Sequence, residues 1–284
     1  AVERLSIMTR TVTINWERAA LAARAAGLAY ADGEALVAGA GRLGLQVAQV
    51  LNDAATGANA CLLKGDGLAI LAVRGTERDF RDILADLDIR KSRLAGGDFA
   101  GRVHSGFLRQ ARAILDGKMA AAVRGLRDRG VTVIACGHSL GGAVALLAAV
   151  RLSLPEVYSF GAPRTGDSTF VQGLAAWRGT FDGARQVHHR FTRAADIVPH
   201  LPLLGLGFRH DAAALYFDGA GRFRGRAPIW RQWASLVWRS ATGPWMRGPI
   251  TGVPIPARPF TDHRVAGYEN LMIGEHLFPE ASAR

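Results

Sequence analysis

Apolar residues recur along the first half of the chain at two spacings, one typical of helices and the other of strands. Alanine- and leucine-rich stretches with apolar residues at helical spacing predict two N-terminal helices, over residues 16–31 and 33–51. Two short apolar runs, residues 60–63 and 68–73, flank an Asp-Gly pair and predict a β-hairpin. A long amphipathic helix is expected over residues 107–129.

Strand-like and helix-like stretches continue to alternate through the rest of the chain. Strands that alternate with helices predict an α/β fold with a mostly parallel central sheet flanked by helices. No stretch of the 284 residues has the composition of a linker, so we expect a single domain over residues 1–284. The expected strands cover residues 131–136, 157–160, 186–193 and 210–217, and the expected helices cover residues 140–150, 169–177 and 227–240.

A serine between two glycines stands where the strand at residues 131–136 gives way to the next helix. The spacing of Gly137, Ser139 and Gly141 is typical of a nucleophile elbow, in which a strained turn exposes the serine hydroxyl. The first N–H groups of the following helix then point toward the place where an oxyanion would form. A buried glycine-rich turn is one alternative. A membrane span over the uncharged residues 131–150 is another, but the central glycines argue against it.

A nucleophilic serine needs a histidine as base, and the histidine needs a carboxylate to fix its tautomer. In proteins with this elbow, the acid and then the histidine follow the serine along the chain. Asp196 closes an expected strand and precedes a loop that two prolines stiffen, which suits a catalytic carboxylate. Five other aspartates compete with it, although each is consistent with a solvated loop charge: Asp167, Asp182, Asp211, Asp218 and Asp262. The histidines that follow Ser139 are His188, His189, His200, His210, His263 and His276.

Several short motifs occur in a fixed order between residues 68 and 268. Together they resemble the class 3, or fungal-type, lipases of the α/β-hydrolase superfamily. The motifs are Arg74-Gly75-Thr76, Val103-His104-Ser105-Gly106-Phe107, Gly137-His138-Ser139-Leu140-Gly141-Gly142, Ser159-Phe160-Gly161-Ala162-Pro163-Arg164-Thr165-Gly166-Asp167, Asp196-Ile197-Val198-Pro199-His200-Leu201-Pro202, and Asp262-His263 with Tyr268.

The resemblance implies an α/β-hydrolase fold with a helical lid and a catalytic triad of Ser139, Asp196 and His263. The implied oxyanion hole consists of the backbone N–H groups of Thr76 and Leu140, with a possible contribution from the Thr76 hydroxyl. No metal or other cofactor is implied. The histidines at positions 104 and 138 are more typical of structural than of catalytic roles.

The lid of such lipases corresponds to residues 77–92 of this chain. Four apolar residues there fall at helical spacing and give one apolar stripe against a charged face, which suits a lid over an acyl groove. An ordinary surface helix is the alternative. Asp86 matches the acid that braces the oxyanion residue in this family, and an exposed helix charge is again the alternative. The apolar stripe consists of Phe80, Ile83, Leu84 and Leu87.

The segment at residues 219–261 is basic and rich in tryptophan, with seven arginines and no acidic residue. Four of the six tryptophans in the chain lie between residues 230 and 245. Tryptophan together with arginine is favoured at a lipid–water boundary, so the helix expected at residues 227–240 is a candidate lipid contact. A helix packed on the core is the alternative, and we also consider that this segment is a specialised insertion.

The preferred interpretation is a serine hydrolase that cleaves lipid esters, first of all a triacylglycerol lipase. A feruloyl-type esterase and a phospholipase A1 are alternatives on the same fold. The formal net charge of +11 suggests a different class, a non-catalytic basic binder of membrane or nucleic acid. The arginines are scattered rather than interleaved with aromatic stacking motifs, so no nucleic-acid partner is expected.

Three further expectations concern redox state, assembly and location. Cys61 and Cys136 are the only cysteines, and buried free thiols are expected rather than a disulfide. We expect a monomer that makes transient contact with a lipid surface. Residues 1–10 contain no apolar signal core, and both a secreted mature form and a cytoplasmic protein agree with the sequence.

Overall fold

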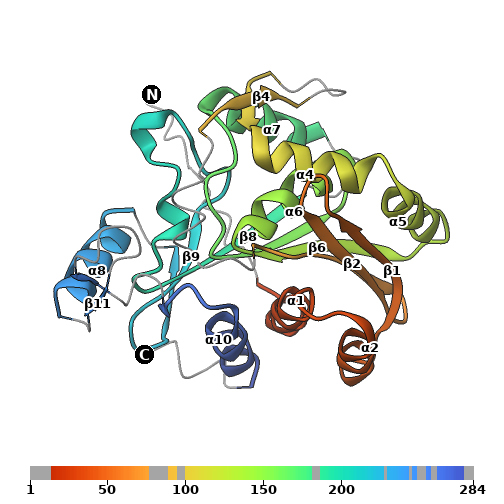
Figure 1. Ribbon diagram of the computed structural model, residues 1–284, viewed down its shortest axis with the longest axis horizontal. Coiled ribbons are helices and arrows are strands. Elements are labelled where there is room, and N and C mark those ends of the chain that lie inside the picture. The colour runs from red at the N-terminus through yellow and green to blue at the C-terminus, as the bar shows by residue number, and fades with distance from the viewer. Residues whose placement is uncertain are drawn as a thin grey trace, which may run out of the picture.

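An eight-stranded sheet crosses the centre of the computed structural model (Figure 1). The structure describes residues 14–76, 89–94, 100–180, 186–226, 229–242, 245–247, 254–256 and 261–277. Four neighbouring pairs of strands, from β3 to β9, are parallel, and the strands at the two edges pair antiparallel. The predicted mostly parallel sheet is confirmed. Its strands, in spatial order, are β1 (Gln46–Asp53), β2 (Ala58–Lys64), β3 (Leu68–Val73), β6 (Thr132–His138), β7 (Glu156–Phe160), β8 (Val187–Arg193), β9 (Ala214–Phe217) and β10 (Phe223–Arg226).

Helices cover both faces of this sheet (Figure 1). Each face has its own apolar core because the strand side chains alternate between the two faces. One core packs against the apolar α6, and the other packs against the alanine-rich side of α1. The helices on one face are α4 (Ser105–Leu115), α5 (Lys118–Asp128), α6 (Leu140–Arg151) and α7 (Ser168–Thr180), and those on the other are α1 (Trp16–Leu28), α2 (Gly33–Arg42) and α10 (Val265–Leu277).

Smaller elements lie around this three-layer body. Helix α8 (Ile229–Thr242) lies near the β9 end of the sheet (Figure 1). No helix in the described ranges is long and apolar enough to cross a membrane, and the uncharged stretch at residues 131–150 forms β6 and most of α6 instead. The remaining elements are β4 (Lys91–Arg93), β5 (Arg102–His104), β11 (Trp245–Arg247), β12 (Pro254–Pro256) and the short 3₁₀ turns η1 (Val198–His200) and η2 (Leu204–Leu206).

Three of the expected elements need correction. The helix expected at residues 33–51 ends at Arg42, and the rest of that stretch forms the edge strand β1. The helix expected at residues 107–129 is two helices, because the chain leaves helical geometry at Gly117, which is extended and caps α5. The strand expected at residues 210–217 is limited to β9.

The remaining expected strands and helices are confirmed within a few residues. The hairpin of β2 and β3 also forms as expected. Both cysteines, Cys61 and Cys136, are buried and free, as predicted.

Candidate active site

Ser139 occupies a strained turn between β6 and α6. Its backbone angles are φ 55° and ψ −135°, a region that non-glycine residues rarely adopt. Gly137 and Gly141 stand back to back in this turn, and a Cβ atom on Gly137 would clash with the backbone of Gly141. The two glycines therefore permit the bend that the sequence predicts. The Ser139 side chain makes no capping hydrogen bond to the helix that follows, which leaves the hydroxyl for other contacts.

The end of β3 lies directly against this turn. Strand β3 pairs in parallel with β6, so both strands end at the same edge of the sheet. A Cβ atom on Gly75 would lie 3.2 Å from Cβ of Ser139, which places the neighbouring Thr76 beside the serine. Leu140 is the first residue of α6, where backbone N–H groups have no helical acceptor. The two segments that carry Thr76 and Leu140 therefore meet at Ser139.

Asp196 and His263 form a buried pair that is 67 positions apart in the sequence. Nδ1 of His263 lies 3.0 Å and 2.9 Å from the two carboxylate oxygens of Asp196. The carboxylate also accepts hydrogen bonds from the Tyr268 hydroxyl at 2.6 Å and from the Val198 N–H at 2.9 Å. Asp196 is 2% exposed and His263 is 6% exposed. These donors satisfy the buried carboxylate and fix the ring of His263.

Three further contacts bring this pair to the serine turn. Nε2 of His138 lies 2.6 Å from the carbonyl oxygen of His263, and the centroids of the two rings are 4.6 Å apart. The Ser139 N–H donates to the carbonyl of Phe160 at 2.9 Å. The next residue, Gly161, has φ +62°, and a Cβ atom there would lie 2.6 Å from Oδ2 of Asp196. The structure therefore brings the pair of Asp196 and His263 up to the Ser139 turn, with Gly161 packed against both members of the pair.

Tyr30 joins the serine turn to the end of β3, a role that no motif in the sequence indicates. Its hydroxyl lies 2.9 Å from Nδ1 of His138 and hydrogen-bonds the backbone of Gly75. Burial raises the pKa of Tyr30 to about 12. Burial and the nearby His263 lower the pKa of His138 well below its usual value. His138 is therefore neutral and donates from Nε2 to the carbonyl of His263, while the Tyr30 hydroxyl donates to Nδ1.

His138 and His104 have the structural roles expected of them. The His104 ring accepts hydrogen bonds from the N–H groups of Gly106 and Phe107 and so caps α4. The ring also stacks on Phe107, with the centroids 4.0 Å apart. Neither histidine lies at the carboxylate of Asp196, which His263 contacts.

The competing aspartates have other partners. Asp167 caps α7 through the Phe170 N–H, and Asp218 binds Arg222 and Arg224. Asp262 accepts from the Ala195 N–H. Asp182 lies outside the described residues. In the described part of the chain, no three His, Cys, Asp or Glu side chains lie close enough together to hold a metal ion.

Asp211 belongs to a second array of serine, histidine and aspartate inside the sheet. Oγ of Ser159 lies 2.8 Å from Nε2 of His188, and Nδ1 of His188 lies 2.8 Å from Oδ2 of Asp211. Arg178 binds the same carboxylate oxygen at 2.7 Å. Ser159 is fully buried near the C-terminal end of β7, where Gly137 of β6 and Arg190 of β8 pair with it. This array is therefore buried beside α7, which contributes Arg178.

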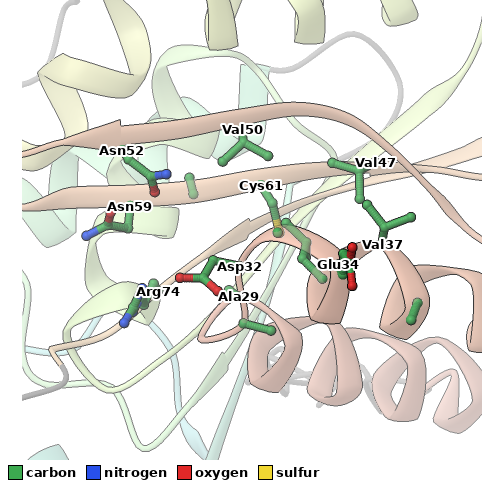
Figure 2. Close-up of a pocket in the computed structure, with 15 residues that line it drawn as sticks. Ala29, Asp32, Glu34, Val37, Val47, Val50, Asn52, Asn59, Cys61 and Arg74 are labelled. Carbon is green, nitrogen blue, oxygen red and sulfur yellow. The ribbon is translucent and has the colours of Figure 1, made fainter.

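A pocket of about 800 Å³ borders the site without containing Ser139 (Figure 2). It lies between the α1–α2 turn and the outer strands β1 and β2. Figure 2 shows Arg74 and Asp32 toward one end and Val37 and Val47 toward the other. Arg74 directly precedes the Gly75–Thr76 segment, so this apolar pocket adjoins the candidate oxyanion hole.

The lid predictions lie outside the described residues. These predictions concern most of residues 77–92, and Phe80, Ile83, Leu84, Leu87 and Asp86 all fall in that part. The tryptophan-rich segment is described in part and forms α8 as expected. The Trp233 ring contacts the His200 ring at a tilt of 41°, with centroids 4.5 Å apart, whereas Trp238 is 71% exposed. Helix α8 therefore packs on the protein with one side and presents a tryptophan to solvent on another.

Comparison with known proteins finds a similarity to one family. Residues 70–206, just under half of the chain, match the sequence model of the family described as Lipase (class 3). This part of the chain is similar to that family. The matched range contains Thr76, Ser139 and Asp196, and His263 lies beyond it.

Curated proteins similar to this chain include fungal lipases. A secreted mono- and diacylglycerol lipase of Fusarium solani is 34% identical over 123 residues, which cover 41% of this chain and 34% of that protein. A lipase of Rhizopus niveus is 33% identical over 150 residues, which cover 49% of this chain and 36% of that protein. The chain thus spans about a third of the length of these curated relatives.

A solved structure gives the fold. The triacylglyceride lipase of Rhizomucor miehei aligns with a TM-score of 0.61 and 23% identity, over 73% of this chain and 83% of that chain. The predicted α/β fold, with a mostly parallel sheet flanked by helices, is therefore confirmed.

Proposed function

We propose that this protein is a serine hydrolase of lipid esters, with triacylglycerols as its main substrate class. The observation that carries the proposal is the strained Ser139 turn packed against the buried pair of Asp196 and His263. The names of the Fusarium solani and Rhizopus niveus relatives support the choice of lipid esters over other esters.

Ser139 is the proposed nucleophile and His263 its base. Asp196 accepts the Nδ1–H proton of His263 in a hydrogen bond, so the lone pair of the neutral ring is on Nε2. This nitrogen takes the proton of the Ser139 hydroxyl as Oγ attacks the ester carbonyl. The carboxylate then stabilises the charged imidazolium.

Thr76 and Leu140 are the proposed oxyanion hole. Their backbone N–H groups belong to the two segments that meet at Ser139, and they would donate to the negative oxygen of the tetrahedral intermediate. His263 next protonates the departing alcohol, which leaves an acyl-enzyme on Ser139. Water attacks this ester with His263 again as base and releases the fatty acid. None of these steps requires a metal or another cofactor.

Replacing Ser139 with alanine tests the proposal. Hydrolysis of tributyrin emulsion and of p-nitrophenyl esters is expected to fall by at least about 10⁴-fold, because loss of the nucleophile removes the acyl-enzyme route. A fluorophosphonate probe followed by peptide mapping is expected to label Ser139. Profiles over acyl chain length, with phospholipid alongside, define the substrate class.

The matched control is Ser159→Ala, because Ser159 also has a histidine partner but lies enclosed within the sheet. This variant is expected to keep the activity of the parent protein. Unchanged hydrolysis by Ser139→Ala, or probe labelling at Ser159, would contradict the assignment.

A further inference from the structure

A second pocket, of about 250 Å³, lies beside the loop that follows Asp196. Three arginines from separate segments line it: Arg164 after β7, Arg190 within β8, and Arg209 before β9. Arg164 is 1% exposed and Arg190 is 5% exposed. His200 and His210 complete its polar wall. No acidic side chain is among the residues that line the pocket in the described part of the chain.

Several donors in this pocket have no protein acceptor. Nη1 of Arg164 donates to the carbonyl oxygens of His200 and Pro202, the latter at 2.7 Å. Nε and Nη2 of Arg164 are buried and make no hydrogen bond to any described residue. Nδ1 of His200 is also buried and also makes no hydrogen bond to any described residue. Unpaired buried donors are costly, so this arrangement favours an acceptor that comes from outside the chain.

No carboxylate forms an ion pair with the three pocket arginines in the described ranges. The charge of Asp211 acts on Arg190, but its Oδ2 atom already binds Arg178 and His188. Burial and the neighbouring Arg209 lower the pKa of Arg164 to about 10, so the guanidinium stays charged at neutral pH. Buried positive charges without a partner oppose folding, and a bound anion would offset that cost.

We propose that this pocket binds a phosphate group. Three guanidinium groups that approach from different segments suit a tetrahedral oxyanion with several acceptor oxygens, whereas a flat carboxylate offers two. The volume of 250 Å³ accommodates such a group together with water molecules. A phosphate dianion also matches the excess of positive charge better than a monoanion does.

The position of the pocket gives the bound group a structural effect. Arg164 holds the carbonyls of His200 and Pro202, and these residues belong to the loop that begins at Asp196. The same segment, residues 161–164, contacts Asp196 through Gly161 at its other end. Phosphate on Arg164 therefore stabilises the loop that carries the proposed catalytic acid.

Titration with inorganic phosphate, followed by calorimetry at constant ionic strength, tests the proposal. We expect saturable binding of one phosphate per chain to the unmodified protein. Sodium chloride of the same ionic strength is expected to give no saturable heat, because diffuse screening has no site. The absence of saturable phosphate binding would overturn the proposal.

Two substitutions locate the site. Arg190→Gln is expected to weaken phosphate binding by about 10- to 100-fold, because each lost charged hydrogen bond contributes in that range. Arg190 is buried, so this variant carries a risk of misfolding; Arg209→Gln removes an exposed pocket charge with less risk. Arg109→Gln removes an equal charge from the exposed side of α4 and is expected to change nothing. Equal weakening by Arg109→Gln and Arg209→Gln would show a net-charge effect and overturn the proposal.

Vesicles distinguish a lipid headgroup from free phosphate as the source of the group. The Ser139→Ala variant is used here so that hydrolysis does not alter the lipids. Sedimentation with phosphatidylcholine vesicles, with and without phosphatidic acid, measures binding in the presence of added inorganic phosphate. If added phosphate displaces the protein from the vesicles, the pocket binds a lipid phosphate. If the protein binds phosphate saturably but stays on the vesicles, the pocket binds free phosphate. Because no step depends on ester hydrolysis, failure here leaves the proposed function untouched.

Discussion

The carboxylate of Asp196 is where most hydrogen bonds of the candidate site meet. It accepts from His263, from the backbone of Val198 and from the hydroxyl of Tyr268, and it is almost fully buried. Burial and the adjacent Asp196 charge raise the pKa of Tyr268 well above its usual value. The tyrosine is therefore a permanent donor to Asp196, and it acts on the proposed chemistry by positioning that carboxylate.

Tyr268→Phe tests this positioning role. We expect kcat on p-nitrophenyl butyrate to fall by about tenfold with KM unchanged, because a hydrogen bond to a buried charge contributes on the order of 1.5–3 kcal/mol. The matched control is Tyr158→Phe, because the Tyr158 hydroxyl donates to a different carboxylate, that of Glu156. An equal loss of kcat in both variants would show a general effect on stability and contradict the positioning role.

The residues of the candidate site differ in how far the sequence predicts them. Ser139 is predictable because its signal is local: a strand, two glycines and a helix in one short stretch. Asp196 and His263 are predictable only from the order in which several motifs follow one another along the chain. Tyr30 and Tyr268 contact their partners across 108 and 72 positions, so only the folded chain reveals these contacts.

Helix α8 has two unlike sides. Gln232 is buried and the Trp233 ring contacts His200, which holds the helix to the loop after Asp196. Val237 and Trp238 are 64% and 71% exposed. Exposed apolar residues on an arginine-rich helix are typical of a surface that touches lipid.

Trp238→Ser tests whether α8 contacts lipid. We expect hydrolysis of emulsified tributyrin to fall by about three- to tenfold, since a partly buried tryptophan contributes on the order of 1 kcal/mol at an interface. Hydrolysis of a dissolved short-chain ester is expected to stay the same. A parallel loss on both substrates would argue against a lipid contact.

The misjudged elements have identifiable causes. Strand β1 is an edge strand whose residues alternate between exposed and half-buried, so no buried apolar face marks it in the sequence. The break between α4 and α5 lies at Gly117, and the apolar positions on its two sides belong to one core, so periodicity alone joins the two helices. Long, well-bounded elements such as α6 are predictable because burial and spacing agree along their whole length.

The whole molecule buries several neutral histidines, which makes its stability depend on pH. Burial, with the charges of nearby cationic residues, lowers the pKa of His189 and of His200 to about 4. Burial also lowers the pKa of His138 and His210 well below the usual value. In the unfolded chain these histidines take up a proton near pH 6.5, whereas in the folded chain they stay neutral down to a lower pH. The stability they contribute is therefore present above about pH 6.5 and is lost as the pH falls toward 4.

Unfolding by denaturant at a series of pH values measures this effect. Each such histidine is expected to steepen the fall in the free energy of unfolding by at most about 1.4 kcal/mol per pH unit. His189→Gln is expected to reduce the slope by up to that amount, and Arg109→Gln is expected to leave it unchanged. A free energy of unfolding that stays constant between about pH 6.5 and 4.5 would contradict this account.

The enclosed array of Ser159, His188 and Asp211 limits what side-chain distances can reveal. A search for hydrogen-bonded serine, histidine and aspartate side chains would return this array, because Ser159 and His188 lie 2.8 Å apart. Backbone position distinguishes the candidate site from it: Ser139 stands at a turn at the start of a helix, and the amide groups of Ser159 lie in a strand paired on both sides. We therefore expect a covalent serine inhibitor to react with Ser139 and to leave Ser159 unmodified.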